Sequence, residues 1–499
     1  MPWYLVLLSI MGTQASAITF LSAPGQAYTD GIRFVQYYFG LPLAMIVICI
    51  FFVPVFHRLK IYTAYEFLEN RFDLKTRTFT SFLFQVSRGL STGISIYAPS
   101  LILSSILGWN IYWTNIIMGG LLIIYTVTGG AKAVAYTQKL QLIIIIAGMI
   151  IAAYMVVHLM PANVGFMEAL HIGGKNGKMN VITSGTTSKG FDWKDKYNIW
   201  SGLIGGFFLA LSYFGTDQSQ VGRYLTAKNK NQSRLGLLVN GLVKVPMQFL
   251  ILLVGVMVFS FYQYNKAPIF FNETQVNIAK QTSFRDSLGI LEKRYSLLSA
   301  TDNSTANSLK AEYRTMLKKA LPSQDVNDTN YIFLRFITDY LPKGLIGLLI
   351  AVIFLAAWGS IAAALNALAS CTMVDVHKIF INKHLTPRMD YKISKLYTLG
   401  WGIFCIIVAE SASNLGNSLI ETVNILGSLF YGVILGIFLV AFWFKSIKGT
   451  ATFYSAVISE VIVIAIYKAD VVSFLWLNVV GALLVIMIAG LLQKFQKTT

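Results

Sequence analysis

Charged residues are scarce in this sequence, at 12% of 499 residues, whereas hydrophobic residues account for 55%. Soluble domains carry about twice that charged fraction, so the composition argues against a soluble protein. Apolar runs near 20 residues recur along the whole chain, and runs of this length are typical of transmembrane helices. The sequence therefore predicts an all-α integral membrane protein whose surroundings are a lipid bilayer.

Cysteine and histidine are also rare, with three and five copies. Cys49, Cys371 and Cys405 all lie in or at the ends of apolar segments, which excludes a disulfide framework. The histidines lie near span ends or in loops, and neither zinc-ligand spacing nor a nucleophile–base pair accompanies them. We therefore expect a protein that is not an enzyme and that carries no enzymatic cofactor.

Acidic residues are outnumbered, at 22 against 40 Lys and Arg, which gives a formal net charge of +18. Lys and Arg collect in the cytoplasmic loops of membrane proteins, so we do not expect a nucleic-acid partner. The basic residues gather at 58–77, 223–234 and 378–395, whereas the short loops 108–110 and 413–418 hold none. We therefore place the basic side and both termini in the cytoplasm, and the protein in the cytoplasmic membrane as a multi-pass protein.

The hydropathy pattern predicts about twelve transmembrane spans. Two long loops, 161–198 and 263–343, then fall on the outer side. The expected spans are 3–23, 33–56, 78–107, 110–128, 133–160, 199–222, 235–262, 344–380, 393–413, 418–444, 450–467 and 473–492.

The first span, Trp3–Ala23, has a polar centre at 12–16, with the sequence GTQAS. Hydrocarbon cannot satisfy these polar side chains, so the helix either buries them against other helices or opens there. An opened helix exposes backbone carbonyls and amides that can hold an ion or a solute. We expect this segment to form part of a binding site.

The sixth span is interrupted by four glycines, at 202, 205, 206 and 215, and it follows the first by five spans. Two broken helices at matching positions are typical of inverted-repeat transporters. We expect a first repeat at 1–160 (spans 1–5), an outer loop at 161–198, a second repeat at 199–447 (spans 6–10) with an outer insertion at 263–343, and a peripheral segment at 448–499 (spans 11 and 12 and a short cytoplasmic tail).

Two cations are expected at membrane depth. Arg88 lies about ten residues, or ~15 Å, into its span, near the middle of an apolar layer ~30 Å thick. It either anchors a substrate carboxylate or is satisfied by helix carbonyls and a buried water. Lys244, beside Pro246, either contacts substrate or binds carbonyls freed by the proline. Asp217, at the end of span 6, is expected to pair with Arg223 or with nearby amides.

Span 8 contains a run of small residues at 356–366, around Ser360. Small residues let helices pack closely. A second interpretation is that Ser360 faces the gap in span 1 and offers its hydroxyl oxygen to a sodium ion.

Five stretches carry a resemblance to a known family: Thr13–Gly25 (TQASAITFLSAPG), Ile96–Leu103 (IYAPSLIL), Tyr125–Gln141 (YTVTGGAKAVAYTQKLQ), Asp217–Lys228 (DQSQVGRYLTAK) and Asn424–Gly432 (NILGSLFYG). The chain resembles the solute:sodium symporter family, in the branches that include monocarboxylate, iodide and multivitamin carriers and bacterial sialic acid symporters. The resemblance implies a leucine-transporter-type fold of two inverted five-helix repeats. It also implies one more helix before Met1, which we expect this chain to lack.

The resemblance further implies a central sodium site. Family members usually have two adjacent hydroxyl residues in span 8, and here the first of them is a glycine. A second site of some members corresponds to Gln138, Ala362 and Ala363, which have no charge or hydroxyl, so we expect that site to be absent. The expected sodium ligands are Gly12, Ala15, Ala356, Gly359 and Ser360.

For the solute, the resemblance implies a pocket between spans 1, 2, 3 and 6, with Lys244 of span 7 as a further candidate. Arg88 is similar to an arginine that sialic acid symporters place against the substrate carboxylate, and Tyr213 resembles an aromatic inner gate. The expected substrate-binding residues are Thr13, Gln14, Ser16, Thr19, Phe34, Tyr38, Arg88, Tyr213 and Lys244.

These features lead us to expect a secondary active transporter that couples sodium entry to the uptake of a small organic anion by alternating access. Two alternatives stay open: a symporter of a sugar or polyol, and an uncoupled or sensor member of the family. The sequence sets no expectation for oligomeric state.

Overall fold

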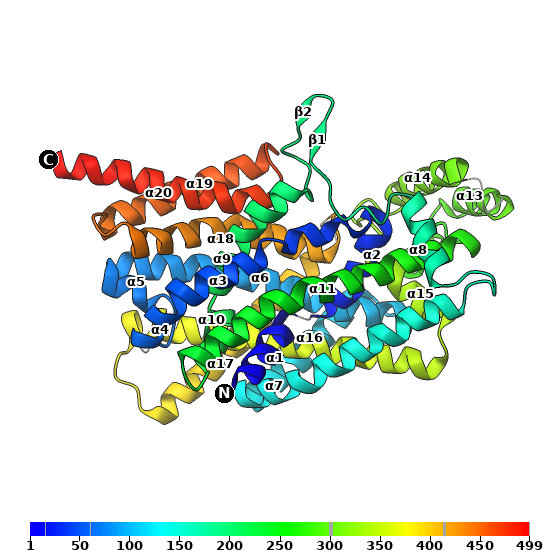
Figure 1. The fold of residues 1–499 in the computed structure, drawn as a ribbon. Helices are drawn as coiled ribbons and strands as arrows, with labels where there is room; N and C mark the ends of the chain where they lie inside the picture. Colours follow the sequence, from blue (N-terminus) through cyan, green and yellow to red (C-terminus); the bar gives the residue numbers. More distant parts are fainter. Residues whose placement is uncertain (15, 60, 299–302, 413–415, 499) are drawn as a thin grey trace.

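The computed structural model describes residues 1–14, 16–59, 61–298, 303–412 and 416–498, and within them every side chain except those at 130–142, 303, 497 and 498. The chain folds into a bundle of long helices with a small two-stranded hairpin on one side (Figure 1). The N-terminal part contains α1 (Trp3–Gln14), α2 (Ala17–Asp30), η1 (Ile32–Tyr38), α3 (Leu41–Val47), η2 (Ile48–Phe52), α4 (Val53–Leu59), α5 (Glu66–Arg71), α6 (Leu74–Leu107), α7 (Ile111–His158) and α8 (Phe166–Lys175).

The C-terminal part repeats this mixture of long and interrupted helices. Its membrane elements are η3 (Ser201–Gly205), α9 (Gly206–Thr216), α10 (Gln218–Leu225), α11 (Lys230–Tyr264), α16 (Lys343–Cys371), η5 (Thr372–Ile381), α17 (Pro387–Ser411), α18 (Leu419–Trp443), α19 (Gly449–Lys468) and α20 (Phe474–Thr498). Its outer elements, with the hairpin that precedes them, are β1 (Thr186–Thr187), β2 (Gly190–Phe191), α12 (Glu273–Ala279), α13 (Arg285–Leu297), α14 (Asn303–Ala320), η4 (Thr329–Tyr331) and α15 (Ile332–Tyr340).

Nine helices among the described residues are long and apolar enough to cross a membrane, and the bent pair α1–α2 makes a tenth candidate. Two shorter apolar helices, Ile143–His158 and Ser201–Thr216, lie where spans 5 and 6 are expected. Each of the twelve expected spans therefore overlaps an apolar helix. The all-α membrane architecture is confirmed, whereas the count of twelve stays a prediction.

Spans 4 and 5 differ from the expectation, because no loop separates them. The backbone is helical throughout α7, from Ile111 to His158. Its 48 residues correspond to ~72 Å, more than twice the thickness of a bilayer core. Glycine weakens a helix without forbidding it, so Gly129 and Gly130, which lie in the gap between the two expected spans, do not end this helix.

The first span is broken where its polar centre predicts. α1 ends at Gln14, α2 begins at Ala17, and the two helix axes differ by 62°. Ser16 has an extended backbone, and its amide donates to the Gln14 carbonyl at 2.9 Å. Further along α2, Gly255 of α11 lies so close to the backbone of Pro24 that a Cβ at this glycine would overlap the Pro24 carbonyl. The second half of the broken span is thus held closely against α11.

The sixth span is interrupted at Asp217, which has an extended backbone between α9 and α10. Its carboxylate caps α10 by accepting from the amide of Ser219 at 2.8 Å, as aspartate at a helix N-cap commonly does. The expectation that Asp217 meets nearby amides is confirmed. The break places a carboxylate inside the bundle, where its remaining oxygen must find another partner.

The insertion that we expect on the outer side forms a small helical unit with its own apolar core, which α12, α13 and α14 build. Figure 1 shows α13 and α14 at one end of the bundle, together with α8 and α15, whereas α4 and α5 lie at the opposite end. Asp328 ties this unit together, since it accepts from Arg314 and from the Phe271 amide at 2.8 Å each. This arrangement puts the insertion beyond one membrane surface, where we expect the outer side.

Candidate functional site

A cavity of about 160 Å³ lies where the break between α1 and α2 faces α6, α9, α11, α16 and α18. Two of its lining residues are cationic, Arg88 and Lys244, and no carboxylate lines it among the described residues. Its polar lining residues are Thr13, Gln14, Ser16, Thr19, Tyr37, Tyr38, Arg88, Ser91, Thr92, Ser95, Tyr213, Lys244, Ser360, Asn424 and Tyr431.

The structure brings together eight of the nine residues expected to contact substrate. Phe34 is the exception: it is fully buried and stacks on Tyr37, with ring centroids 5.6 Å apart. It therefore supports the cavity wall through Tyr37 and does not line it. The eight that line the cavity are Thr13, Gln14, Ser16, Thr19, Tyr38, Arg88, Tyr213 and Lys244.

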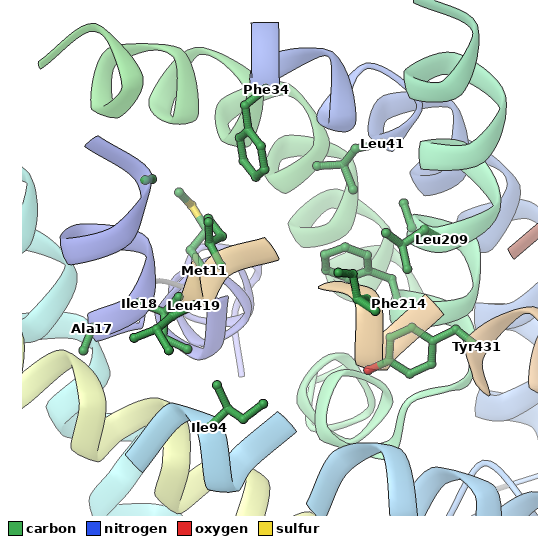
Figure 2. Close-up of a cluster of buried hydrophobic side chains, with 14 of the residues drawn as sticks. Met11, Ala17, Ile18, Phe34, Leu41, Ile94, Leu209, Phe214, Leu419 and Tyr431 are labelled. Atoms are coloured by element: carbon green, nitrogen blue, oxygen red, sulfur yellow. The ribbon is translucent and has the colours of Figure 1, made fainter. Parts of the chain in front are cut away.

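Apolar side chains form two facing walls around this site (Figure 2). Leu41, Leu209 and Phe214 gather on one side, near Tyr431, while Ile18 lies on the other side. All five also line the cavity. A solute in the cavity would therefore contact hydrocarbon on two sides and polar groups between them.

Arg88 is compensated from within the protein. Its Nη1 lies 3.9 Å from Oδ2 of Asp217, whose side chain is fully buried. The same carboxylate oxygen accepts from the Tyr431 hydroxyl at 2.8 Å, and the guanidinium carbon lies 5.8 Å from the centre of the Tyr213 ring. The ion-pair partner of Asp217 is thus Arg88 and not the expected Arg223, because the α9–α10 break directs the carboxylate inward.

Lys244 has a different environment. It is 2% exposed, and its Nζ lies 5.5 Å from the centre of the Tyr38 ring. Among the described residues, no carboxylate forms an ion pair with it and no carbonyl accepts a hydrogen bond from it. An unpaired cation at membrane depth costs about 2.5–3.5 kcal/mol on insertion scales. Lys244 is therefore the charge in this cavity that lacks an internal counter-charge.

Three further polar groups on the cavity lining are buried donors without a protein partner in the described part of the chain. They are Nε2 of Gln14, Nε of Arg88 and Nδ2 of Asn424. Asn424 is held by the Tyr37 hydroxyl, which donates to its Oδ1 at 3.1 Å, so its amide nitrogen is available for other contacts. Buried donors without a protein partner are rare, and a water, an ion or a functional role commonly accounts for them. All three would be satisfied by a ligand rich in acceptor oxygens.

Of the five expected sodium ligands, Ser360 shares the cavity lining with Thr13, Gln14 and Ser16 at the break in α1–α2. Ser360 is buried and lines the cavity, and its hydroxyl donates to the carbonyls of Ala356 and Ala357 at 3.1 Å each. Gly12, Ala356 and Gly359 are buried behind the lining, and Ala15 lies outside the described residues. The neutral hydroxyl and carbonyl oxygens of this region suit a small hard cation. The ligand set itself stays a prediction.

The position of the second sodium site is apolar where the structure describes it. Ala362 and Ala363 are buried and pack against Tyr125. The side chain of Gln138 lies outside the described part. The two alanines offer no side-chain oxygen there, and the absence of a second sodium site stays a prediction.

Several lining residues were not predicted. Ser91, Thr92 and Ser95 follow Arg88 at intervals of three, four and seven residues, so they share one face of α6. This helical spacing is the signal that could have found them. Asn424 and Tyr431 of α18 lie within one of the five family-like stretches, but nothing local to them indicates a binding role.

The family model described as the Sodium:solute symporter family matches residues 1–283 and 309–459. The chain belongs to this family. Its relatives and the shared fold are those of transporters, which agrees with the expectation of a non-enzymatic, multi-pass membrane protein.

The names of individual relatives refer to different solutes. The chain is 29% identical to the human sodium/iodide cotransporter over 87% of its own length, and 26% identical to the sodium/sialic acid symporter SiaT of Proteus mirabilis over 98%. It covers 86% of SiaT but only 59% of the iodide cotransporter and 61% of the human sodium-coupled monocarboxylate transporter 1. The chain thus spans about three fifths of several relatives that it matches.

A solved structure shows the fold. The structure of a Na⁺-coupled sialic acid symporter in a substrate-bound outward-open state has a TM-score of 0.77, at 24% identity, and it covers 99% of this chain and 90% of that one. The expected leucine-transporter-type fold is therefore confirmed for this symporter family member. The solute is a separate question, because the relatives differ in theirs.

Proposed function

We propose that this symporter couples Na⁺ entry to the uptake of a small organic anion, through alternating access to the central cavity. The observation that carries the proposal is the chemistry of the lining. The cavity presents one cation without an internal counter-charge, Lys244, and three buried donors without partners, and it has no carboxylate among its described lining residues. A carboxylate supplies the missing negative charge and the missing acceptor oxygens together.

The size of the cavity supports a small solute. Pockets for drug-sized ligands usually have volumes of roughly 300–1,000 Å³, whereas this one has about 160 Å³. The apolar walls around Leu41, Leu209 and Phe214 suit the hydrocarbon part of such an anion. A short carboxylate, with its charged end at Lys244 and its carbon skeleton between the walls, fits both features.

The sodium ion belongs at the break between α1 and α2, facing Ser360. Family membership and the neutral oxygens there support this placement. A bound Na⁺ can drive transport only through a difference in affinity between two conformations. Binding at the junction of α1, α2 and α16 would favour the outward-open arrangement of the broken helix, so that the sodium gradient loads the solute site.

The first test is a thermal-shift screen of the purified protein with short carboxylates, sugars and amino acids, each in sodium and in potassium. A ligand that binds only the folded state raises the midpoint by mass action. The stabilising compound is then used, in labelled form, for uptake into proteoliposomes. We expect a carboxylate to stabilise and to accumulate only with an inward sodium gradient. Equal uptake in sodium and potassium gradients would contradict the coupling.

One observation favours a second candidate function, a symporter of a neutral polyol or sugar. Asp217 already neutralises Arg88, so one of the two cations needs no anionic ligand. Many neutral hydroxyl and amide groups also line the cavity. Lys244→Met separates the candidates: transport of a neutral solute would survive this substitution largely unchanged, whereas transport of an anion would not. Lys445→Met, on the exposed turn after α18, is the matched control.

A further inference from the structure

A second hollow lies on the side of the bundle next to the central cavity. It has a volume of about 250 Å³, and it is lined by residues of α2, α7, α8 and α11. Thirteen of its fifteen lining residues are apolar, and none is charged. α11 contacts both α2 and α7 (Figure 1), and residues of all three helices line the hollow. We call it the lateral groove.

The lateral groove opens on the lipid-facing surface. Ile150 and Leu250 on its rim are 64% and 60% exposed, although both lie within apolar helices. Its floor is closed, since Phe20, Met149 and Ile251 are each less than 10% exposed. The groove is therefore continuous with the surface that the bilayer already covers, and it extends from that surface toward the core.

Two residues belong to both spaces. These are Ser16, directly before α2, and Thr19, in its first turn. Both line the lateral groove and the central cavity. They are also the only polar residues among those that line the groove. The first turn of α2 is thus the partition between an apolar groove on the membrane side and a polar cavity inside.

We propose that the lateral groove holds an acyl chain of a bilayer phospholipid, packed against the first turn of α2. Water does not suit most of the groove, because a buried water needs two to four polar partners and the two hydroxyls of the lining both lie at one end. A lipid tail reaches the groove without leaving the hydrocarbon layer. The occupant therefore lies directly behind the helix break that lines the solute site, and this binding site is independent of which solute the protein carries.

Photocrosslinking tests the occupant on the unmodified full chain. The protein is reconstituted in nanodiscs with a phospholipid that carries a diazirine in its acyl chain, and adducts are mapped by mass spectrometry. We expect adducts to concentrate on the groove residues of α7 and α11, such as Met149, Ile150 and Leu250. Adducts spread evenly over lipid-facing positions, including Ile124 and Ile407, would overturn the proposal.

A matched pair of substitutions on α7 tests it a second time. Ala153 lines the groove, whereas Ala147 is exposed on the same helix and does not line it. Ala153→Phe fills the groove, so we expect at least a threefold loss of groove adducts, and Ala147→Phe should leave them unchanged. Equal labelling of both variants would overturn the proposal. So would a diazirine-bearing free fatty acid that labels the groove where the phospholipid does not.

Discussion

The two cations of the central cavity differ in whether the protein supplies a counter-charge. Arg88 has Asp217 at 3.9 Å, and the Tyr431 hydroxyl shares the same carboxylate. Lys244 faces the Tyr38 ring, with no carboxylate partner among the described residues. The charge of Arg88 is thus balanced within the protein, whereas the charge of Lys244 has no counter-charge among the described residues.

This difference assigns different tasks to two residues of the same charge. A compensated arginine that faces the α9–α10 break fixes the relative positions of α6, α9 and α18, which meet at Asp217. An uncompensated lysine raises the energy of the empty site, and binding of the proposed anionic solute would lower that energy. The first residue is expected to govern stability, and the second to govern affinity.

The largest effect is expected for Asp217→Asn. The amide keeps the size of the side chain and can still cap α10, but it leaves Arg88 as a buried charge without a partner. Breaking a buried ion pair from one side typically costs 3–5 kcal/mol, and we expect about 3 kcal/mol because the 3.9 Å contact is long for a direct hydrogen bond. Thermal unfolding of the purified protein in one detergent measures the loss.

Two variants accompany this measurement. Asp470→Asn removes the carboxylate of an exposed pair with Lys194, and it should cost less than about 0.5 kcal/mol. The double variant Arg88→Gln/Asp217→Asn removes both charges, so it should recover most of the lost stability. If the double variant is as unstable as Asp217→Asn, then Asp217 stabilises the fold through its cap and not through Arg88.

The next effect is the loss of affinity in Lys244→Met. Methionine preserves much of the side-chain length without the charge, and a hydrogen bond to a charged group is worth about 1.5–3 kcal/mol. We expect KM for the anion to rise roughly 10- to 100-fold, while the thermal midpoint of the empty protein stays equal or rises because an unpaired buried charge is removed. A lower midpoint together with an unchanged KM would mean that Lys244 is structural.

The sequence could predict that both cations lie at membrane depth, because the depth of a residue follows from its position in the span and the rise per residue of a helix. It could not predict which of them is compensated. Asp217 is 129 positions away from Arg88 in sequence, and its inward direction depends on the local geometry of the break between α9 and α10. A contact of this kind is set by tertiary packing, and no periodicity within α6 or α9 encodes it.

The same reasoning explains the rest of the site. The break in α1–α2 could be predicted because polar residues in hydrocarbon have a large local cost. Phe34 lies behind the cavity wall because η1 turns Tyr37 and Tyr38 toward the cavity. The hydropathy pattern cannot predict which side of η1 faces the cavity. The division into repeats at 1–160 and 199–447 stays a prediction, although the fold to which it belongs is confirmed.

A smaller effect is expected at the sodium site, where all the predicted ligands are neutral oxygens. Ser360→Ala removes the hydroxyl that lines the cavity and leaves the carbonyls of Ala356 and Ala357 in place. The loss of one neutral ligand should raise the sodium concentration for half-maximal uptake by roughly five- to tenfold, or about 1–1.4 kcal/mol. Ser105→Ala, in the outer turn of α6, serves as the control. An unchanged sodium dependence would exclude Ser360 as a ligand.

The effect with the lowest expected minimum, and the sharpest test of the contrast between the two cations, is the change in sodium binding without substrate. Two positive charges about 10 Å apart repel by roughly 0.4–1.7 kcal/mol at effective dielectric constants of ~80 to ~20. Lys244 carries an unbalanced charge, so Lys244→Met should tighten sodium binding to the empty protein by about 2- to 15-fold, as measured by thermal shift against sodium concentration. Arg88→Gln should not tighten sodium binding, because removing Arg88 also leaves the negative charge of Asp217 unpaired and disturbs the fold.

The wild-type protein should bind sodium more tightly once an anion is present, and Lys244→Met should lose this cooperativity. Identical sodium titrations for wild type and Lys244→Met would mean that Lys244 does not act as a free charge in the cavity.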